Sequence, residues 1–376
     1  EDLQEQGQLG EIGGQAYLLG LVNQTPSSLH GAAYAQFVEQ AAIRRRMLTA
    51  ANEMARLAYD QEKDIRTILD EVEKSVFSLG ASRVRHDLKP VNEVVSEYYD
   101  YVDEQSKRDE ELSGVPTGLY DLDKLLGGMQ KSDLLIIAGR PGTGKTGFLL
   151  SVAKTAAQKY KKNVAMFSLE MSNQQLVQRL IAQETGIDTL RLRTGKLQDH
   201  EWDVFTKAID VLSATNIWLD DTPAITPLAM RTKCRRLDNE HKLDLVLVDY
   251  LQLMSSDSRN ENRVQEVSYI SRSLKALARE LQVPVLAAAQ LSRAVESREE
   301  KKPVLSDLRE SGSLEQDSDI VIFIQKSKES DKTTNLIVAK HRNGPTSPGI
   351  GVVFLEKLAK FVNAAPAESE PAPEKR

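Results

Sequence analysis

Residues 139–146 combine glycines with a lysine and a threonine in a pattern suited to phosphate binding. They match GxxxxGK(S/T) between an apolar segment and a helical one. Glycines let successive backbone N–H groups turn toward an anion, and the start of the following helix favours negative charge. Lys145 would contact the β- and γ-phosphates, and the Thr146 hydroxyl would bind Mg²⁺. The candidate nucleotide-binding residues are Gly139, Arg140, Pro141, Gly142, Thr143, Gly144, Lys145 and Thr146.

The same segment contains a second pattern, the GxGxxG of dinucleotide-binding folds, at Gly142, Gly144 and Gly147. Glu170 follows about 20 residues later, where such folds place the acid that binds a ribose. GxGxxG alone is a weak signal, and it leaves the Lys-Thr pair unexplained. The downstream sequence completes a nucleoside triphosphatase, so we favour the phosphate loop.

Three polar residues follow apolar segments downstream of this loop. Asp249 ends the apolar segment that begins at Leu245, and such an acid after a phosphate loop helps to hold Mg²⁺. Glu170 could orient and deprotonate an attacking water, although a helix-capping acid would give the same pattern. Gln290 follows residues 285–289 and could hydrogen-bond the γ-phosphate, although a surface glutamine would look the same. Together they predict an ATP-hydrolysing site.

Two cations, Lys340 and Arg342, lie two residues apart before an Asn-Gly-Pro turn. Presented from an edge loop, they could reach the ATP of another subunit. An arginine used in this way accelerates hydrolysis by about 10³–10⁵-fold. From composition alone, a solvated basic loop is the preferred interpretation.

The elements that must position these residues begin at Gly114, where short apolar segments alternate with helical ones. Fully apolar strands separated by helices predict a mainly parallel sheet that is covered on both faces. The last strands follow one another without helices, which predicts an antiparallel edge. The expected strands are 134–138, 164–169, 217–219, 245–248, 283–288, 320–324, 336–339 and 352–355.

Residues 1–80 are predicted to be almost entirely helical. Apolar residues within 31–58 form one helical stripe, and Asp64 can cap a second helix, which predicts an antiparallel hairpin. After a linker at 81–90, the apolar residues of 91–102 recur with the spacing of an amphipathic helix, before a charged run. This helix packs either on its own domain or in a groove of a neighbouring subunit.

Composition excludes several classes of protein. No segment approaches the ~18 apolar residues of a membrane span, and one cysteine, Cys234, excludes an internal disulfide framework and fits a reducing cytoplasm. The five histidines are scattered, so a histidine-built metal site is not expected. A net charge of −6 does not indicate a nucleic-acid binder. The chain begins at Glu1 with no signal peptide, and we expect that its natural beginning is missing.

Taken together, these motifs resemble the bacterial replicative DNA helicases of the DnaB type, which are RecA-like hexameric ATPases. The resemblance runs from about residue 7 to residue 362. The phosphate loop is generic, whereas segments 307–319 and 340–345 are much more specific to this family. The other matching segments are 13–18, 116–123, 127–129, 168–172, 248–254 and 290–293.

The resemblance implies an α/β fold with a RecA-like P-loop ATPase core and a mainly parallel sheet at residues 114–363. It implies that residues 1–80 are a partial all-helical N-terminal domain, because some helices of that domain are absent here. Residues 81–113 correspond to a linker whose helix docks on the neighbouring subunit. Residues 364–376 form a tail that is predicted to be disordered.

The resemblance also assigns roles in the active site. Lys145 would bind phosphate, Thr146 and Asp249 would hold Mg²⁺, Glu170 would be the general base, and Gln290 would sense the γ-phosphate. Lys340 and Arg342 would be fingers offered to the adjacent subunit, which reverses the preference for a solvated loop. The implied cofactors are ATP and Mg²⁺.

The family binds single-stranded DNA through loops that face the channel of a homohexameric ring. Arg309, Glu310 and Gly312 match its backbone-gripping loop, and residues 255–264 match a second channel loop. DNA in such a channel would meet these loops rather than the net charge of the whole chain. Primase and a helicase loader are the further expected partners, and the expected polarity is 5′ to 3′. The alternatives are a RecA-like recombinase that forms filaments and a small-molecule kinase.

Overall fold

The computed structural model describes residues 14, 16–17, 20, 31–60, 63–65, 68, 71–72, 75, 90–106, 112–256, 262–292, 295–296, 298, 302–308, 312–326 and 333–364. The chain divides into two units, Glu1–Asp103 and Glu104–Arg376. The helices among the described residues are all too short or too polar to cross a membrane.

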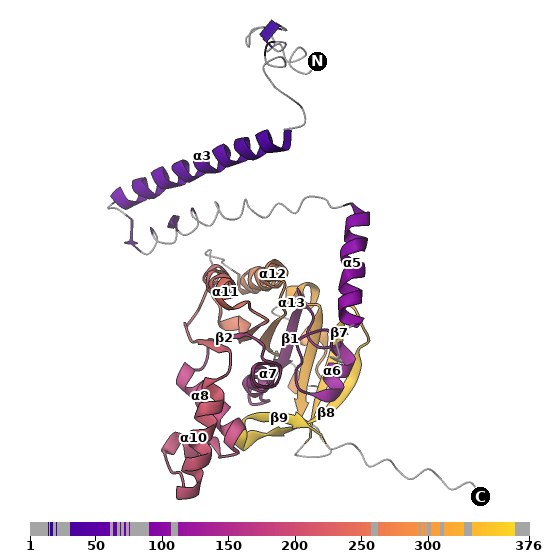
Figure 1. Cartoon of the computed structure of the whole chain (residues 1–376). Coiled ribbons are helices and arrows are strands. Elements are labelled where there is room, and N and C mark those ends of the chain that lie inside the picture. The colour runs from indigo at the N-terminus through magenta and orange to yellow at the C-terminus, as the bar shows by residue number, and fades with distance from the viewer. Residues whose placement is uncertain are drawn as a thin grey trace, which may run out of the picture. The chain divides into compact units, whose positions relative to one another are not determined.

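The N-terminal part of the chain contains helix α3 (Gly31–Tyr59), which confirms the helix expected over 31–58. The second helix of the expected hairpin lies mostly outside the described residues. Helix α5 (Val91–Ser106) confirms the amphipathic helix expected at 91–102. The helix is labelled in Figure 1. Its apolar side chains, including Tyr98 and Tyr99, are exposed in the single chain.

The second unit is built on a sheet of nine strands among the described residues, in the order β3-β2-β4-β5-β1-β6-β7-β8-β9. Neighbouring strands from β3 to β6 in this order are parallel, and the pairs β6–β7, β7–β8 and β8–β9 are antiparallel. The strands are β1 (Leu134–Gly139), β2 (Val164–Ser168), β3 (Ile217–Asp220), β4 (Leu245–Asp249), β5 (Val285–Gln290), β6 (Ile320–Lys326), β7 (Thr333–His341), β8 (Ser347–Leu355) and β9 (Lys360–Asn363).

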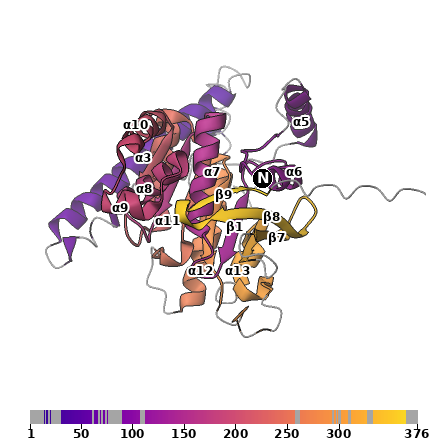
Figure 2. The same ribbon diagram turned by 90° about the horizontal axis from the view of Figure 1, so that it is seen from below.

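Helices cover both faces of this sheet, which is why its central strands are apolar throughout. In β1, Leu135 and Ile137 face one core, whereas Leu134, Ile136 and Ala138 face the other. Helix α7 packs in the first core and helix α12 in the second, and Figure 2 shows them on opposite sides of the sheet. The helices are α6 (Tyr120–Leu126), α7 (Lys145–Tyr160), α8 (Asn173–Thr185), α9 (Thr189–Thr194), α10 (Asp199–Ser213), α11 (Pro227–His241), α12 (Arg263–Leu281) and α13 (Gly312–Asp317).

The predicted fold class is confirmed: the sheet is mainly parallel, carries helices and ends in an antiparallel edge. All eight predicted strands are present, with ends that differ by a few residues. The prediction missed β9, which has four residues and pairs only with β8. Its polar ends, Lys360 and Asn363, leave too short an apolar segment to stand out in the sequence.

Candidate active site

The register of the parallel strands brings the candidate catalytic residues to one edge of the sheet. Gly139 at the end of β1 pairs with Gln290 at the end of β5, and Ser168 pairs with Asp249 at the ends of β2 and β4. The Leu169 N–H also donates to the Asp249 carbonyl over 2.7 Å. Because parallel strands have their carboxyl ends at the same edge, four separate sequence segments converge there.

A cavity of about 630 Å³ lies at this edge. The phosphate loop connects β1 to α7, and Gly142 and Gly144 adopt positive φ angles of 79° and 93° that favour glycine. The residues that line the cavity are Pro141, Gly142, Gly144, Lys145, Thr146, Gly147, Glu170, Met171, Gln175, Arg179, Thr189, Tyr250, Gln290, Phe354, Glu356 and Ala359.

Close packing behind the loop accounts for the last two glycines of the GxGxxG pattern, Gly144 and Gly147. A Cβ on Gly144 would lie 2.7 Å from the Phe354 ring, and one on Gly147 would lie 2.7 Å from the Ala359 carbonyl oxygen. Both contacts are too short for a side chain. The third glycine is therefore explained by Phe354 of β8 and by Ala359, just before β9, which pack against α7, without a dinucleotide.

Lys145 begins α7 and its ammonium lies over the loop itself. Its Nζ donates to the carbonyls of Gly139 and Arg140 over 3.1 and 3.4 Å. Burial lowers the pKa of Lys145, and the nearby carboxylates of Asp249 and Glu170 oppose that shift. The cation is thus held among weak acceptors that a phosphate could replace.

Asp249 supplies a buried carboxylate directly beside the loop. It is 1% exposed, and burial raises its pKa, against which the hydrogen bond from Thr146 acts. Its Oδ2 has no hydrogen-bond partner among the described residues. A buried carboxylate oxygen without a donor, next to a hydroxyl, is a donor set that suits Mg²⁺, which prefers oxygen ligands. The residues present therefore fit this ion.

Glu170 and Gln290 complete this edge of the sheet. The exposed side chain of Glu170 lines the cavity two residues after β2 ends. The peptide group of Gln290 is held by Gln252, whose Oε1 accepts from the Gln290 N–H over 3.2 Å. The Gln252 Nε2 in turn donates to the Gln290 carbonyl over 3.3 Å. Gln252 thus fixes the end of β5, a function that its sequence position alone did not reveal.

The side chain of Arg140 is directed away from the cavity. Its Nε donates to Glu296 over 2.8 Å, and its Nη1 donates to the Leu291 carbonyl over 2.9 Å. Arg140 is not among the residues that line the cavity. Its guanidinium therefore braces the loop against the segment that follows β5.

The sequence prediction missed Arg179, a cation of α8 that lines the cavity. Burial lowers the pKa of Arg179, and the carboxylates of Asp249 and Glu170 oppose the shift. Helix α8 starts directly after the strand that leads to Glu170, with a capping box of Ser172 and Gln175. In the sequence, the signal for Arg179 would have been a basic residue two turns into the helix that follows Glu170.

Replacement of Arg179 with alanine is expected to weaken ATP binding by about 10–100-fold, the factor that corresponds to a hydrogen bond to a charged group. The measurement is a titration with a fluorescent ATP analogue. Arg236→Ala is the matched control, because Arg236 lies exposed on α11 and is not part of the cavity lining. An unchanged affinity of the Arg179 variant would show that this cation does not contact the nucleotide.

Lys340 and Arg342 are not brought to this edge. Strand β7 runs antiparallel to β6, and His341 at its end pairs with Ile320 at the start of β6. Since β6 is parallel to β1, Lys340 and Arg342 lie at the amino end of β1, whereas the phosphate loop lies at its carboxyl end. Within one chain, the two cations and the phosphate loop therefore lie at opposite ends of the same strand.

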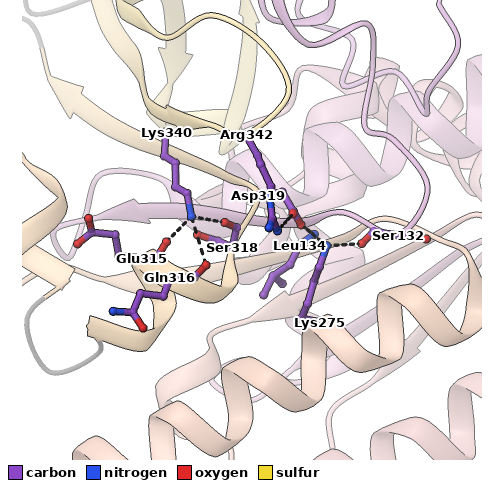
Figure 3. Close-up of polar contacts among 9 residues, drawn as sticks. All are labelled: Ser132, Leu134, Lys275, Glu315, Gln316, Ser318, Asp319, Lys340 and Arg342. Atoms are coloured by element: carbon purple, nitrogen blue, oxygen red, sulfur yellow. Dashed lines mark hydrogen bonds and ion pairs between the residues drawn. The ribbon is translucent and has the colours of Figure 1, made fainter.

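Figure 3 shows what these two cations contact within the subunit. The Lys340 ammonium donates to the carbonyls of Glu315 and Ser318, at the end of α13 and just beyond it. Burial lowers the pKa of Lys340. Arg342 donates from Nη1 to the Asp319 carboxylate over 3.3 Å, while 63% of its side chain remains exposed.

Of the three DNA-binding candidates, Gly312 is among the described residues. Arg309 and Glu310 lie outside the described residues. Gly312 begins α13, and a Cβ there would meet nothing within 4 Å, so packing does not require a glycine. Of the second candidate loop, 255–264, residues 257–261 lie outside the described residues.

Comparisons with known proteins agree on one family. The family model "DnaB-like helicase C terminal domain" matches residues 114–363. The chain is 44% identical over 363 residues to the replicative DNA helicase DnaB of Geobacillus stearothermophilus, covering 95% of this chain and 80% of that protein. It is 42% identical over 362 residues to the replicative DNA helicase DnaC of Bacillus subtilis (strain 168), covering 94% and 80%.

Two solved structures are similar as well. A DnaB-like replicative helicase, described with its interactions with primase, matches with a TM-score of 0.76 and 30% identity over 97% of this chain and 90% of that chain. A second structure, described as an ATPase domain, matches with a TM-score of 0.70 and 34% identity over 74% of this chain and all of that one.

Proposed function

The chain belongs to the DnaB family of replicative DNA helicases, and we propose that its ATP sites form between neighbouring subunits of a homohexameric ring. It is an ATP-dependent DNA helicase with a RecA-like core. The single observation that carries the proposal is the separation of Lys145 from Arg342 at opposite ends of β1. In a head-to-tail ring, one end of each subunit faces the other end of the next.

Each composite site would take its nucleotide-binding residues from one subunit and its two fingers from the next. The backbone of the phosphate loop and Lys145 would hold the phosphates, and Gln290 would hydrogen-bond the γ-phosphate. Thr146 and Asp249 would hold Mg²⁺, which would supply positive charge to neutralise part of the phosphate charge. Glu170 would orient the attacking water and accept its proton.

Lys340 and Arg342 of the neighbouring subunit would stabilise the charge that develops on the transferred phosphoryl group. Their engagement would depend on the closure of the interface, because neither cation can reach the phosphate loop of its own subunit. ATP hydrolysis would thereby be coupled to the opening and closing of the ring's interfaces. This movement would carry the channel loops along one DNA strand and exclude the other.

Helix α5 would help to hold the ring together. Its apolar face is exposed in the single chain, and an exposed apolar helix face of this kind fits a groove on a partner. We infer that residues 81–113 are the linker that places this helix on the adjacent subunit. Residues 1–80 would be a partial N-terminal domain, residues 114–363 the motor and residues 364–376 a tail.

Single-stranded DNA would be bound in the channel by Arg309, Glu310 and Gly312, with translocation from 5′ to 3′. The solved relative is described with primase, which supports primase as a partner of this chain too, and a loader would place the ring on DNA. A cytoplasmic location fits this task.

DNA-dependent ATP hydrolysis by the hexameric fraction tests this proposal. We expect single-stranded DNA to stimulate turnover, and electron microscopy with ATP to show rings. A small-molecule kinase would show no stimulation by DNA, and a recombinase-like protein would form filaments. Either result would contradict the proposed function.

Replacement of Arg309 with alanine is expected to weaken binding of single-stranded DNA and to reduce the salt dependence of binding by about one phosphate contact. Fluorescence anisotropy at several salt concentrations measures both quantities. Arg236→Ala on α11 serves again as the control. A salt dependence that equals that of the unmodified chain would place Arg309 away from the phosphates.

A further inference from the structure

Asp319 is a buried carboxylate at the junction of β1, β6, β7 and α12. It is 3% exposed and directly precedes β6. Its Oδ2 accepts from the Leu134 N–H over 2.8 Å and from the Lys275 ammonium of α12. Its Oδ1 accepts from Arg342 Nη1 over 3.3 Å (Figure 3).

The backbone of Asp319 is tied to the same elements as its side chain. Its N–H donates to the Leu134 carbonyl over 2.9 Å, and its carbonyl accepts from the Arg342 N–H over 2.8 Å. The carboxylate therefore sits on a backbone that is fixed to a central strand on one side and to the finger residue on the other. Such a buried, fully connected group has little freedom to move.

Arg342 needs an anchor of this kind because it stands on a turn and is mostly exposed. A free arginine side chain loses rotamer entropy when it is fixed in one geometry, so an unanchored finger would rarely adopt the orientation that reaches a phosphate. The contact with Asp319 holds one edge of the guanidinium, while the exposed remainder is available to a second anion. A guanidinium has five donors, so it can serve both.

The charge of Asp319 is shared among its partners, so that it does not cancel the charge of Arg342. Lys275 also donates to the Ser132 carbonyl over 2.8 Å, which fixes its ammonium at Oδ2. A second acid, Asp133, lies nearby: its pKa is raised to about 6 by burial and by the negative charge of Asp319. The cluster thus combines two acids with Lys275, His341 and Arg342.

We propose that Asp319 is a positioning residue that holds Arg342 in the orientation needed to reach the ATP of the adjacent subunit. The inference rests on the proposed function of Arg342 as a trans-acting finger. It assigns to Asp319 a part in hydrolysis although Asp319 lies at the end of β1 away from the phosphate loop. Asp319 is also the last residue of segment 307–319, which is specific to the family in sequence.

Asp319→Asn tests the proposal because an asparagine has only one acceptor oxygen. If this oxygen faces Leu134 and Lys275, the amide NH₂ group faces Arg342 and cannot hold it. We expect kcat for ATP to fall by about 10–100-fold, as misplacement of a catalytic group by about 1 Å does. The KM for ATP should change little, because the phosphate loop is untouched. Asp203→Asn, an exposed acid on α10, is the matched control.

A mixing experiment separates positioning from a general loss of structure. Asp319→Asn subunits have an intact phosphate loop, whereas Lys145→Ala subunits have an intact finger. Mixed rings contain interfaces with both intact parts, so the mixture should hydrolyse ATP faster than either variant alone. If Asp319→Asn acts only by disrupting the fold, the mixture will hydrolyse ATP no faster than either variant alone. That result would overturn the proposal.

A further variant keeps the test decisive. If Asp319→Asn fails to fold by thermal melting, Asp319→Glu keeps the charge and shifts the carboxylate by one methylene group. Wild-type turnover of a folded Asp319→Glu hexamer would then overturn the proposal. Failure of Arg342→Ala itself to be rescued in mixed rings would instead refute the trans finger.

Discussion

Arg342→Ala is expected to abolish ATP turnover while nucleotide binding remains largely intact. The loss should reach about 10³–10⁵-fold, the range by which an arginine finger accelerates phosphoryl transfer. Binding should persist because the phosphate loop, Thr146 and Asp249 lie at the other end of β1. Steady-state hydrolysis and titration with a fluorescent ATP analogue measure the two quantities.

Mixing identifies the subunit on which Arg342 acts. On random assembly of equal amounts of Arg342→Ala and Lys145→Ala subunits, about one quarter of the interfaces combine an intact loop with an intact finger. Turnover should therefore recover in part, although each variant alone is inactive. No recovery at any mixing ratio would show that Arg342 does not act across the interface.

Glu170→Gln is expected to bind ATP and single-stranded DNA yet hydrolyse ATP about 10²–10⁴-fold more slowly, the usual contribution of a general base. The amide keeps the size of the side chain but cannot accept a proton. Glu170 and Lys145 line the same cavity, and both Glu170 and Asp249 interact electrostatically with Lys145, so we expect the attacking water to lie near Glu170.

The control for this variant is Glu240→Gln, an exposed acid on α11 that should keep normal turnover. A single-turnover experiment separates hydrolysis from product release, since only the chemical step should slow in the Glu170 variant. Normal turnover of Glu170→Gln would remove Glu170 as the base. Glu170 would then be an ordinary acidic residue just beyond the end of β2.

The sheet was predictable from the sequence because burial on both faces leaves its central strands almost without polar residues. Alternate residues of β1 between Leu134 and Ala138 face two different cores. A continuous run of apolar residues in the sequence already indicates a strand that is buried on both faces. Strand β9 was not predictable because it is short and half polar. A strand at the edge of a sheet pairs with a single neighbour, and its apolar pattern in the sequence is therefore weaker.

The candidate site was predictable only where its residues follow strands. Asp249, Glu170 and Gln290 stand at or just after strand ends, and parallel pairing brings all three to one edge. Arg179 lies inside a helix, where one basic residue resembles many others, so only the fold reveals that it reaches the cavity. The same holds for Asp319, whose partners Leu134, Lys275 and Arg342 come from three segments that are far apart in the chain.

The three glycines match the pattern of a dinucleotide-binding fold although other structural reasons account for them. Gly142 and Gly144 have the positive φ angles that a phosphate loop requires. Gly147 completes GxGxxG only because the Ala359 carbonyl lies against α7. The packing of a segment that is distant in sequence thus accounts for the dinucleotide-like spacing, and the Lys-Thr pair was the better guide.

Unwinding of synthetic forks with defined tails is the most direct test of the central claim, that the chain is a ring-shaped motor with ATP sites between its subunits. With ATP and Mg²⁺, we expect strand separation on forks that offer a 5′ single-stranded tail, and none with Arg342→Ala rings. Forks with only a 3′ tail should remain paired. The absence of unwinding on every fork, or unwinding by Arg342→Ala rings, would contradict the account.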